Sequence, residues 1–246
     1  MLAIIGGSGL YTADNLFETR RLEKQETPFG ITSSEILSGK YQDLDLFFLA
    51  RHGISHQIAP HQINYRANIY ALKQLGVTHI ISVNAVGGIP TEFAPETIAI
   101  PDQIIDYTWG RQHSFSDINS GKVQHIDFTE PYSEKLRNLI ISSAQRQAIN
   151  VVPYGTYGCT NGPRLESKAE ISRFGKDGCH IIGMTGMPEA ALARELSIEY
   201  ASIALVVNWC AGIGASKITM QQINESINKG MVTVRQLIIA SLAGWC

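Results

Sequence analysis

The sequence predicts an α/β fold in which a central mixed β-sheet is flanked by helices, and two observations support this. Short apolar runs with the length of buried strands alternate along the chain with longer segments whose apolar residues recur at helical spacing. Several of the apolar runs end in glycine or small polar residues, at the strand ends where α/β proteins bind their ligands. We find neither an internal repeat nor a linker, so we expect residues 1–246 to form one domain.

The first two predicted strands each lead into residues that suit a phosphate group. Residues 2–5 run into a Gly-Gly-Ser-Gly loop at 6–9, but a third glycine and a following helix are missing for a dinucleotide-binding fingerprint. Residues 44–50 deliver Arg51 and His52 at their end. A guanidinium beside an imidazole is a good phosphate clamp. The alternative is a structural ion pair for Arg51 and a strand-capping role for His52.

The rest of the chain continues the alternation. Further strands are predicted at residues 79–83, 97–100, 103–106, 151–157, 180–182 and 200–207, and helices at residues 64–75, 133–148, 167–174, 188–196 and 219–242. Small residues at 84–88 predict a loop in which backbone N–H groups can approach a ligand closely. Residues 109–129 are polar and irregular, and a loop of this length is either functional or a solvated excursion. Gly230 marks a point where the last helix could bend or split.

Two loops marked by glycine and proline, at residues 161–170 and 183–189, each open into a predicted helix. The first turn of a helix presents free N–H groups, which favour anions. These two loops are therefore predicted to carry part of the functional site.

The composition excludes several classes of partner. Hydrophobic residues make up 44% of the chain and charged residues 17%, which is typical of a folded globular protein. With 20 Lys and Arg against 22 Asp and Glu, the net charge of −2 predicts neither a nucleic-acid nor a membrane partner. The N-terminus does not resemble a signal peptide, and no apolar run approaches the ~20 residues that span a bilayer.

The cysteines and histidines predict no metal site. The cysteines lack CxxC spacing, which indicates reduced thiols in a cytoplasmic protein: Cys159, Cys179, Cys210 and Cys246. His52 and His56 could share one helical face as metal ligands, but neither an HExxH motif nor a carboxylate accompanies them.

Several motifs in one order resemble the trimeric nucleoside phosphorylases, most closely the methylthioadenosine phosphorylase branch. They are GGSG at 6–9, RHG at 51–53, NYRAN at 64–68, GPR at 162–164, AE at 169–170 and MTGMPE at 184–189. The resemblance covers nearly the whole chain. It implies the single-domain nucleoside phosphorylase fold, a homotrimer with sites near subunit interfaces, a nucleoside and inorganic phosphate as substrates, and no organic cofactor.

The resemblance also assigns residues to phosphate and ribose. It implies that phosphate is held by Ser8, Arg51, His52, Thr185 and the loop containing Asn84 and Ala85, and that the ribose lies against Met184. Asn84 departs from the hydroxyl residue that the family carries at this position, so the resemblance leaves open whether its side chain or its backbone serves.

At the base, the chain departs from the methylthioadenosine enzymes. Those enzymes carry an aspartate after the long buried strand and a small residue after the Gly-Pro-Arg turn, whereas this chain has Asn208 and Glu166, as in phosphorylases of 6-oxopurines. Glu166 would accept a hydrogen bond from purine N1–H, and Asn208 would meet O6 or N7 and support the leaving base. The alternatives are a strand-end amide that bonds backbone, for Asn208, and stabilisation of a helix N-terminus, for Glu166.

For the 5′ position of the ribose, the resemblance implies an apolar pocket. Met220 and Ile223 match residues at the start of the last helix, and His125 matches a residue that a neighbouring subunit contributes. Methionine is adaptable and suits a thioether. The spacing of Met220 and Ile223 is equally that of ordinary helix core.

The methylthio-type body and the 6-oxopurine residues together predict phosphorolysis of 5′-methylthioinosine to hypoxanthine and 5-methylthioribose 1-phosphate. The alternatives are an inosine/guanosine phosphorylase and a methylthioadenosine phosphorylase. From other classes, a nucleotide-dependent oxidoreductase is weakened by the incomplete glycine fingerprint, and a nucleoside-binding protein would not consume phosphate.

Overall fold

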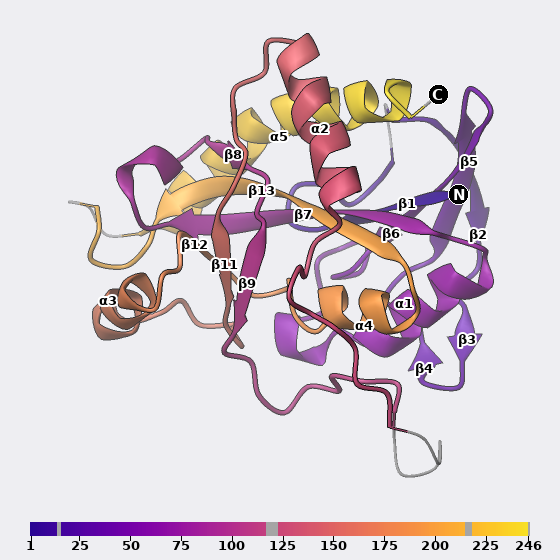
Figure 1. Cartoon of the computed structure of the whole chain (residues 1–246), viewed down its shortest axis with the longest axis horizontal. Coiled ribbons are helices and arrows are strands. Elements are labelled where there is room, and N and C mark those ends of the chain that lie inside the picture. The colour runs from indigo at the N-terminus through magenta and orange to yellow at the C-terminus, as the bar shows by residue number, and fades with distance from the viewer. Residues whose placement is uncertain (14–15, 117–122, 215–217, 246) are drawn as a thin grey trace.

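The computed structural model of the chain describes residues 1–13, 16–116, 123–214 and 218–245. Its main sheet is mixed and is covered by helices on both faces (Figure 1). The strand order is β10 (Val151–Val152), β8 (Ile98–Ala99), β13 (Glu199–Trp209), β7 (His79–Gly88), β1 (Leu2–Gly6), β6 (Leu44–Ala50), β5 (Ile36–Tyr41) and β2 (Glu18–Leu22). A branch leaves β7 through β12 (Ile181–Gly183), β11 (Thr156–Cys159) and β9 (Gln103–Asp106).

The centre of the sheet is parallel and mostly buried. Strands β6, β1, β7 and β13 run in the same direction, and Ile4 of β1 pairs with Phe48 of β6 and Ile81 of β7. Every residue of β1 is buried, because helices cover both faces and leave no side of this strand exposed to solvent. The carboxyl ends of these four strands therefore meet at one edge of the sheet, where the predicted site residues follow them.

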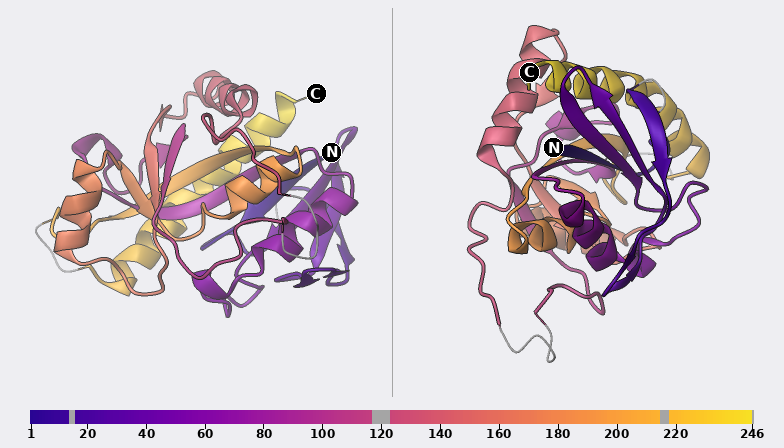
Figure 2. Two further views of the ribbon diagram at one scale, coloured as in Figure 1. Left: turned by 60° about the horizontal axis from the view of Figure 1, so that its bottom comes forward. Right: turned by 90° about the vertical axis from the view of Figure 1, so that its right-hand side faces the viewer.

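Two pairs of helices form the outer layers (Figures 1 and 2). Helices α2 (Glu134–Arg146) and α5 (Met220–Ala243) cover one face, with Ile140 and Leu237 in the same core as Leu205 of β13. Helices α1 (Tyr65–Gln74) and α4 (Glu189–Glu195) cover the other, with Ile69 and Leu192 packed in a second core. Helix α3 (Lys168–Lys176) lies to one side. None of the described helices is long and apolar enough to cross a membrane.

The α/β fold and the helix positions predicted from the sequence are confirmed. Four helices begin after a residue whose side-chain oxygen accepts a backbone N–H of the first turn: Asn64, Ser133, Ser167 and Thr219. Helix α5 is continuous through Gly230, so a split at this residue is wrong. A Cβ on this glycine would lie 2.5 Å from Leu205, so the glycine instead lets the helix approach the sheet closely.

The predicted loop at residues 84–88 is wrong, because these residues extend β7 to Gly88. Strand β13 pairs with them along one edge and β12 pairs with Gly87 and Gly88. In these ladders, backbone N–H and C=O groups of β7 bond to neighbouring strands, whereas the predicted loop would have left them free for a ligand. A Cβ on Gly88 would lie 1.8 Å from the carbonyl oxygen of Phe93, so the glycine reflects close packing and not a turn.

Two further regions differ from the prediction. The expected strand at 151–157 is divided into β10 and β11, which pair with different neighbours, and Pro153 between them has no N–H for a ladder. The strands between residues 18 and 41, including the hairpin of β3 (Glu26–Thr27) and β4 (Gly30–Ile31), were not predicted. Strands β5 and β2 extend the sheet beyond β6, whereas β3 and β4 form a separate two-stranded sheet. These strands are mostly half-buried or exposed and lack the apolar runs of the centre.

Candidate functional site

A cavity of about 360 Å³ opens at the carboxyl ends of the parallel strands. This volume is within the range that small-molecule sites occupy. The structure places all the predicted site residues except His125 in its wall: Ser8, Arg51, His52, Asn84, Ala85, Glu166, Met184, Thr185, Asn208, Met220 and Ile223. His125 is exposed and does not line this cavity.

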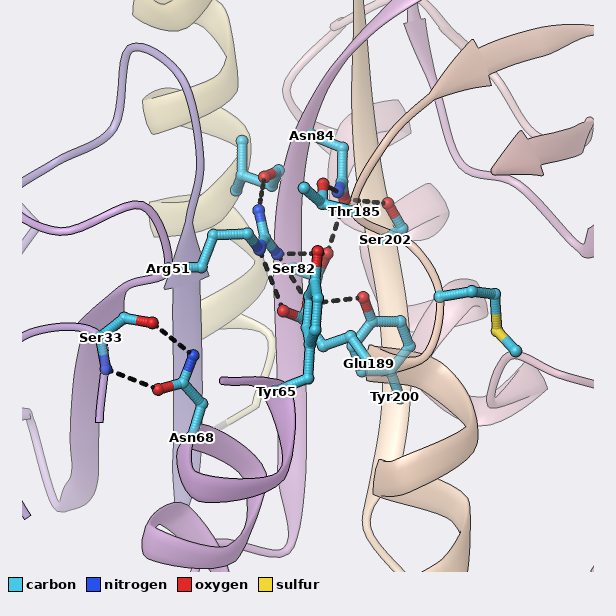
Figure 3. Close-up of polar contacts among 12 residues, drawn as sticks. Ser33, Arg51, Tyr65, Asn68, Ser82, Asn84, Thr185, Glu189, Tyr200 and Ser202 are labelled. Carbon is cyan, nitrogen blue, oxygen red and sulfur yellow. Dashed lines mark hydrogen bonds and ion pairs between the residues drawn. The ribbon is translucent and has the colours of Figure 1, made fainter. Parts of the chain in front are cut away.

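Arg51 lies at the base of the cavity and is completely buried. Its Nε and Nη2 donate to the two carboxylate oxygens of Glu189 at 3.0 and 2.7 Å, Nη1 donates to the carbonyl of Val83 at 2.8 Å, and Nη2 also donates to Ser82 at 3.2 Å (Figure 3). Burial disfavours the charge, but Glu189 outweighs it and holds the pKa of Arg51 above its ordinary value. The alternative of a structural ion pair is therefore present, and one of the five guanidinium hydrogens, on Nη1, has no acceptor among the described residues.

The glycine loop after β1 covers this guanidinium. A Cβ on Gly7 would lie 2.8 Å from Nη1 of Arg51 and 2.7 Å from the carbonyl oxygen of Val83, so only glycine allows the backbone to pass here. The ladder between β1 and β7 ends at Ser82. Between Ser82 and Gly87, where β12 begins to pair, no strand lies along this edge of β7, and the cavity opens against its residues 84–87.

His52 is neutral at pH 7 and has one defined tautomer. Its Nδ1 lies 2.8 Å from the carbonyl oxygen of Ile58, and because a carbonyl only accepts, Nδ1 carries the proton. Nε2 therefore has a lone pair. Burial, together with Arg51 and the His56 ring 4.4 Å away, lowers the pKa of His52 to about 4. His52 can consequently accept a hydrogen bond from a protonated phosphate oxygen.

Asn84 makes three side-chain hydrogen bonds inside the protein, and the second hydrogen of its Nδ2 has no acceptor among the described residues. Its Oδ1 accepts from the hydroxyls of Ser82 at 2.6 Å and Ser202 at 2.8 Å, and its Nδ2 donates to Oγ1 of Thr185 at 2.8 Å (Figure 3). Asn84 is 1% exposed and Thr185 is 7% exposed. The side chain of Asn84 therefore holds Thr185, which follows β12, against β7.

Glu166 lies in the wall of the cavity just before helix α3. Its Oε1 accepts from Thr160 Oγ1 at 2.6 Å, and its Oε2 has no hydrogen-bond partner among the described residues. The helix is capped by Ser167 and Glu170, which form a capping box, and Glu170 pairs with Arg164 at 2.8 Å. Glu166 itself precedes the cap and lies outside the first helical turn, which contains Glu170.

A β-bulge directs Asn208 to the cavity. Val206 pairs with Val86 and Asn208 pairs with Gly87, so β13 carries an extra residue at this point. Nδ2 of Asn208 donates to the carbonyl of Trp209 at 2.8 Å, which is the backbone contact expected as the alternative. That bond uses one amide hydrogen and leaves the second hydrogen and Oδ1.

Asn208 and Glu166 belong to one part of the wall. Both Nδ2 of Asn208 and Sγ of Cys210 lie against Gly87, where a Cβ would be 3.4 and 2.7 Å away. Burial and the nearby Glu166 carboxylate raise the pKa of the Cys210 thiol. A carboxylate oxygen, an amide oxygen and an amide hydrogen are therefore available at one part of the cavity wall.

Helix α5 gives the apolar part of the wall. Met220 is 64% exposed and lines the cavity, so it is not a core residue, whereas Ile223 is 8% exposed and belongs to the core as well as the cavity. Asn224 lines the cavity on the same helix and is exposed. This part of the wall therefore offers both an apolar side chain, Met220, and a polar one, Asn224.

Sequence reasoning missed Arg111 and two residues of the cavity wall, Tyr11 and Asn224. It also gave no role to Glu189, which pairs with Arg51. Arg111 is 9% exposed and donates to the carbonyls of Met187, Thr160 and Asn161 at 2.5, 3.3 and 2.9 Å, so it ties the two predicted loops together. An arginine in an irregular polar segment gives no signal of this. Glu189 had one, since it lies in the MTGMPE motif at the start of a helix.

Among the described residues there is no group of three or more His, Cys, Asp or Glu that could hold a metal ion. The described cysteines are free and buried: Cys159, Cys179 and Cys210. Cys246 lies outside the described residues.

Known proteins resemble the chain in both sequence and structure. The sequence matches the phosphorylase superfamily over residues 1–243. It is 47% identical over 238 residues to a probable S-methyl-5′-thioinosine phosphorylase of Xanthomonas campestris pv. campestris, covering 96% of this chain and 95% of the relative. It is 43% identical to the 6-oxopurine nucleoside phosphorylase of Pyrococcus furiosus, covering 98% and 91%. The structure is similar to methylthioadenosine phosphorylase from Schistosoma mansoni in complex with adenine, with a TM-score of 0.93, 34% identity, and 98% and 90% coverage.

Proposed function

The chain belongs to the phosphorylase superfamily, and on that premise we propose that it cleaves S-methyl-5′-thioinosine with inorganic phosphate, giving hypoxanthine and 5-methylthioribose 1-phosphate. The observation that carries the proposal is the presence, in one cavity, of Glu166 and Asn208 together with Met220 and Ile223. The first pair suits a 6-oxopurine, and the second suits a thiomethyl group. Relatives named for this activity support it.

Phosphorolysis requires no protein nucleophile. A phosphate oxygen forms the new bond to C1′ of the ribose while the bond from C1′ to the purine nitrogen breaks, and the bonding electrons leave with the base. The protein must hold phosphate, orient the ribose and stabilise the charge that develops on the base. Ser8, Arg51, His52 and Thr185 are the proposed phosphate residues, and Met184 contacts the ribose.

Asn208 and Glu166 are proposed to select the base. Hypoxanthine presents a donor at N1 and an acceptor at O6, whereas adenine presents an acceptor at N1 and a donor at its 6-amino group. The carboxylate of Glu166 accepts from N1–H, and the free amide hydrogen of Asn208 donates to O6, while its Oδ1 accepts from N7–H of the departing base. With adenine, Glu166 faces a lone pair, and an unmatched buried polar group costs about 1–3 kcal/mol, or more when charged.

An inosine or guanosine phosphorylase is the second candidate, and Asn224 favours it. This exposed amide lines the cavity on the same helix as Met220 and could bind a 5′-hydroxyl. Relatives named as 6-oxopurine nucleoside phosphorylases support this alternative. The two candidates share the base residues and differ only in the 5′ group.

We also propose a cytoplasmic homotrimer that uses no organic cofactor. Met220 supports the trimer, since an apolar side chain that lines the cavity is 64% exposed in the single chain, and a neighbouring subunit that brings His125 would cover it. The free thiols support a reducing compartment.

The experiment is to incubate the protein with methylthioinosine, with and without inorganic phosphate, and to follow hypoxanthine and the sugar phosphate. We expect both products, in equal amounts, only when phosphate is present. Binding of the nucleoside without phosphate-dependent cleavage would instead identify a nucleoside-binding protein and overturn the proposal.

A further inference from the structure

We propose that Asn84 is a positioning residue, which directs the hydroxyl hydrogen of Thr185 toward the bound phosphate and does not contact phosphate with its own side chain. The inference deepens the proposed function and rests on it. It starts from a chain of hydrogen bonds that connects Arg51, Ser82, Asn84 and Thr185 in that order (Figure 3).

The direction of the chain is fixed at Arg51. A guanidinium only donates, so the Oγ of Ser82, 3.2 Å from Nη2 of Arg51, must accept there. The hydroxyl hydrogen of Ser82 is then free to donate, and Oδ1 of Asn84 lies 2.6 Å away. The opposite orientation of the Asn84 amide would place Nδ2 against both Ser82 and Ser202. It would leave Ser82 only the Tyr200 hydroxyl, which already donates to Glu189, as an acceptor.

Ser202 reinforces this orientation from the neighbouring strand. Its hydroxyl donates to the same Oδ1 of Asn84 at 2.8 Å. With Oδ1 held by two hydroxyls, Nδ2 is the atom that faces Thr185, at 2.8 Å from Oγ1. Oγ1 of Thr185 therefore accepts from Asn84, and its own hydrogen must point elsewhere.

The cavity is where that hydrogen can be used. Thr185 lines it, 7% exposed, next to the wall formed by Arg51 and His52. Tyr157 is the other polar neighbour. Its hydroxyl oxygen accepts the backbone N–H of Thr185 at 3.5 Å and also lies within hydrogen-bond reach of the Thr185 hydroxyl. Each link thus donates in one direction, from a cation to a hydroxyl at the surface of the cavity, and bonds in such a chain polarise one another.

The charges around the site make this hydroxyl important. Glu189 neutralises Arg51 through two hydrogen bonds, and His52 presents a lone pair at neutral pH. The site therefore depends strongly on neutral donors to hold the anion. A Thr185 hydroxyl that donated to residue 84 would be lost to phosphate.

The test is a double-mutant cycle on inorganic phosphate binding, measured by titration calorimetry without nucleoside. We expect Thr185→Val to weaken phosphate binding by about 10–100-fold, as for a hydrogen bond to a charged group, and Asn84→Leu by about 5–20-fold. In the double variant we expect the affinity of Thr185→Val alone, within about two-fold, because Asn84 acts through Thr185.

Two controls separate this role from a general loss of structure. Ser202→Ala removes a hydrogen bond from the same network but leaves Ser82 to orient the amide, so phosphate affinity should change by less than about three-fold. Tyr157→Phe should also leave it within that range, whereas tighter phosphate binding in this variant would show that Thr185 donates to Tyr157 and would overturn the proposal. In turnover assays, Asn84→Leu should raise KM for phosphate and not KM for the nucleoside.

Equal losses from Asn84→Leu in the wild-type and Thr185→Val backgrounds would show direct contact of Asn84 with phosphate and overturn the inference alone. Unchanged affinity in Asn84→Leu would do the same. Phosphate binding with the expected cycle but no cleavage of methylthioinosine would leave the inference standing and overturn the proposed function. A wild-type protein that binds no phosphate would overturn both.

Discussion

Arg51 and Glu189 form a two-point ion pair that is enclosed by protein. The contacts measure 3.0 and 2.7 Å, and the two side chains are 0% and 1% exposed. Tyr200 donates to the same carboxylate at 2.9 Å. The pair fixes the guanidinium at the base of the cavity by connecting the residue after β6 to the start of α4.

We predict that Glu189→Gln destabilises the protein by about 3 kcal/mol, because removing one partner leaves a buried charge uncompensated. The measurement is the free energy of unfolding from urea denaturation. Glu170→Gln is the matched control, since it changes an ion pair to Arg164 at the surface and keeps a side chain that can complete the capping box. We expect a cost below about 1 kcal/mol there. Equal losses of unfolding free energy in the two variants would show that the buried pair stabilises the protein no more than the surface pair does.

The base residues give a second prediction. Asn208→Asp combined with Glu166→Ser should shift the ratio of kcat/KM for methylthioinosine over methylthioadenosine toward adenine by about 100-fold, since both polar matches to a 6-oxopurine are lost. Asn138→Asp, the same chemical change on the exposed face of α2, serves as the control and should leave the ratio unchanged. An unaltered ratio in the double variant would rule out the proposed mode of base recognition.

Met220 gives a third. Met220→Gln should lower kcat/KM for methylthioinosine relative to inosine by about 10-fold, which is the scale of discrimination that one apolar group supplies. Val232→Gln changes an exposed apolar residue elsewhere on α5 and should not alter this ratio. If Met220→Gln leaves the ratio of kcat/KM for methylthioinosine over inosine as unchanged as Val232→Gln does, Met220 does not contact the 5′ group.

His52 predicts a pH dependence of stability. Its folded-state pKa of about 4 lies below the ordinary value of 6.5, so between these values the unfolded chain binds more protons than the folded one. Stability is therefore complete above about pH 6.5 and is lost as the pH falls toward 4, by about 3 kcal/mol from this residue. His56 and His79, whose pKa values are also lowered by burial, add to the trend.

Urea denaturation of the phosphate-free protein between pH 4.5 and 7.5 checks the His52 prediction. His52→Gln keeps a donor for the Ile58 carbonyl but cannot be protonated, so it should flatten the dependence. Identical slopes for the variant and the wild type would show that His52 is not the group responsible.

The sequence could predict the residues of the cavity wall because they follow apolar strands directly. Ser8, Arg51 and Asn208 come at or just after strands whose hydrophobic runs are plain, and parallel strands bring their carboxyl ends together. Motif resemblance then separated roles that residue type alone left open, such as the phosphate and ion-pair roles of Arg51. Both roles apply to Arg51, since its contacts with Glu189, Val83 and Ser82 leave one guanidinium hydrogen, on Nη1, without an acceptor among the described residues.

The remainder depended on contacts that no local pattern contains. Asn84 is oriented by Ser202, 118 positions later, and holds Thr185, 101 positions later, so its role could not be predicted from its own segment. The glycines after it resemble a loop in sequence, but ladders on β7 make them strand. Arg111 likewise acts through carbonyl groups of Thr160, Asn161 and Met187, which are distant in the chain.

The most direct test is to assay methylthioinosine, methylthioadenosine and inosine in separate reactions with the wild-type protein at saturating phosphate, and to quantify the base released in each. We expect hypoxanthine to form fastest from methylthioinosine, and adenine to form from methylthioadenosine about 10⁴-fold more slowly. Adenine release at a comparable rate would contradict this expectation.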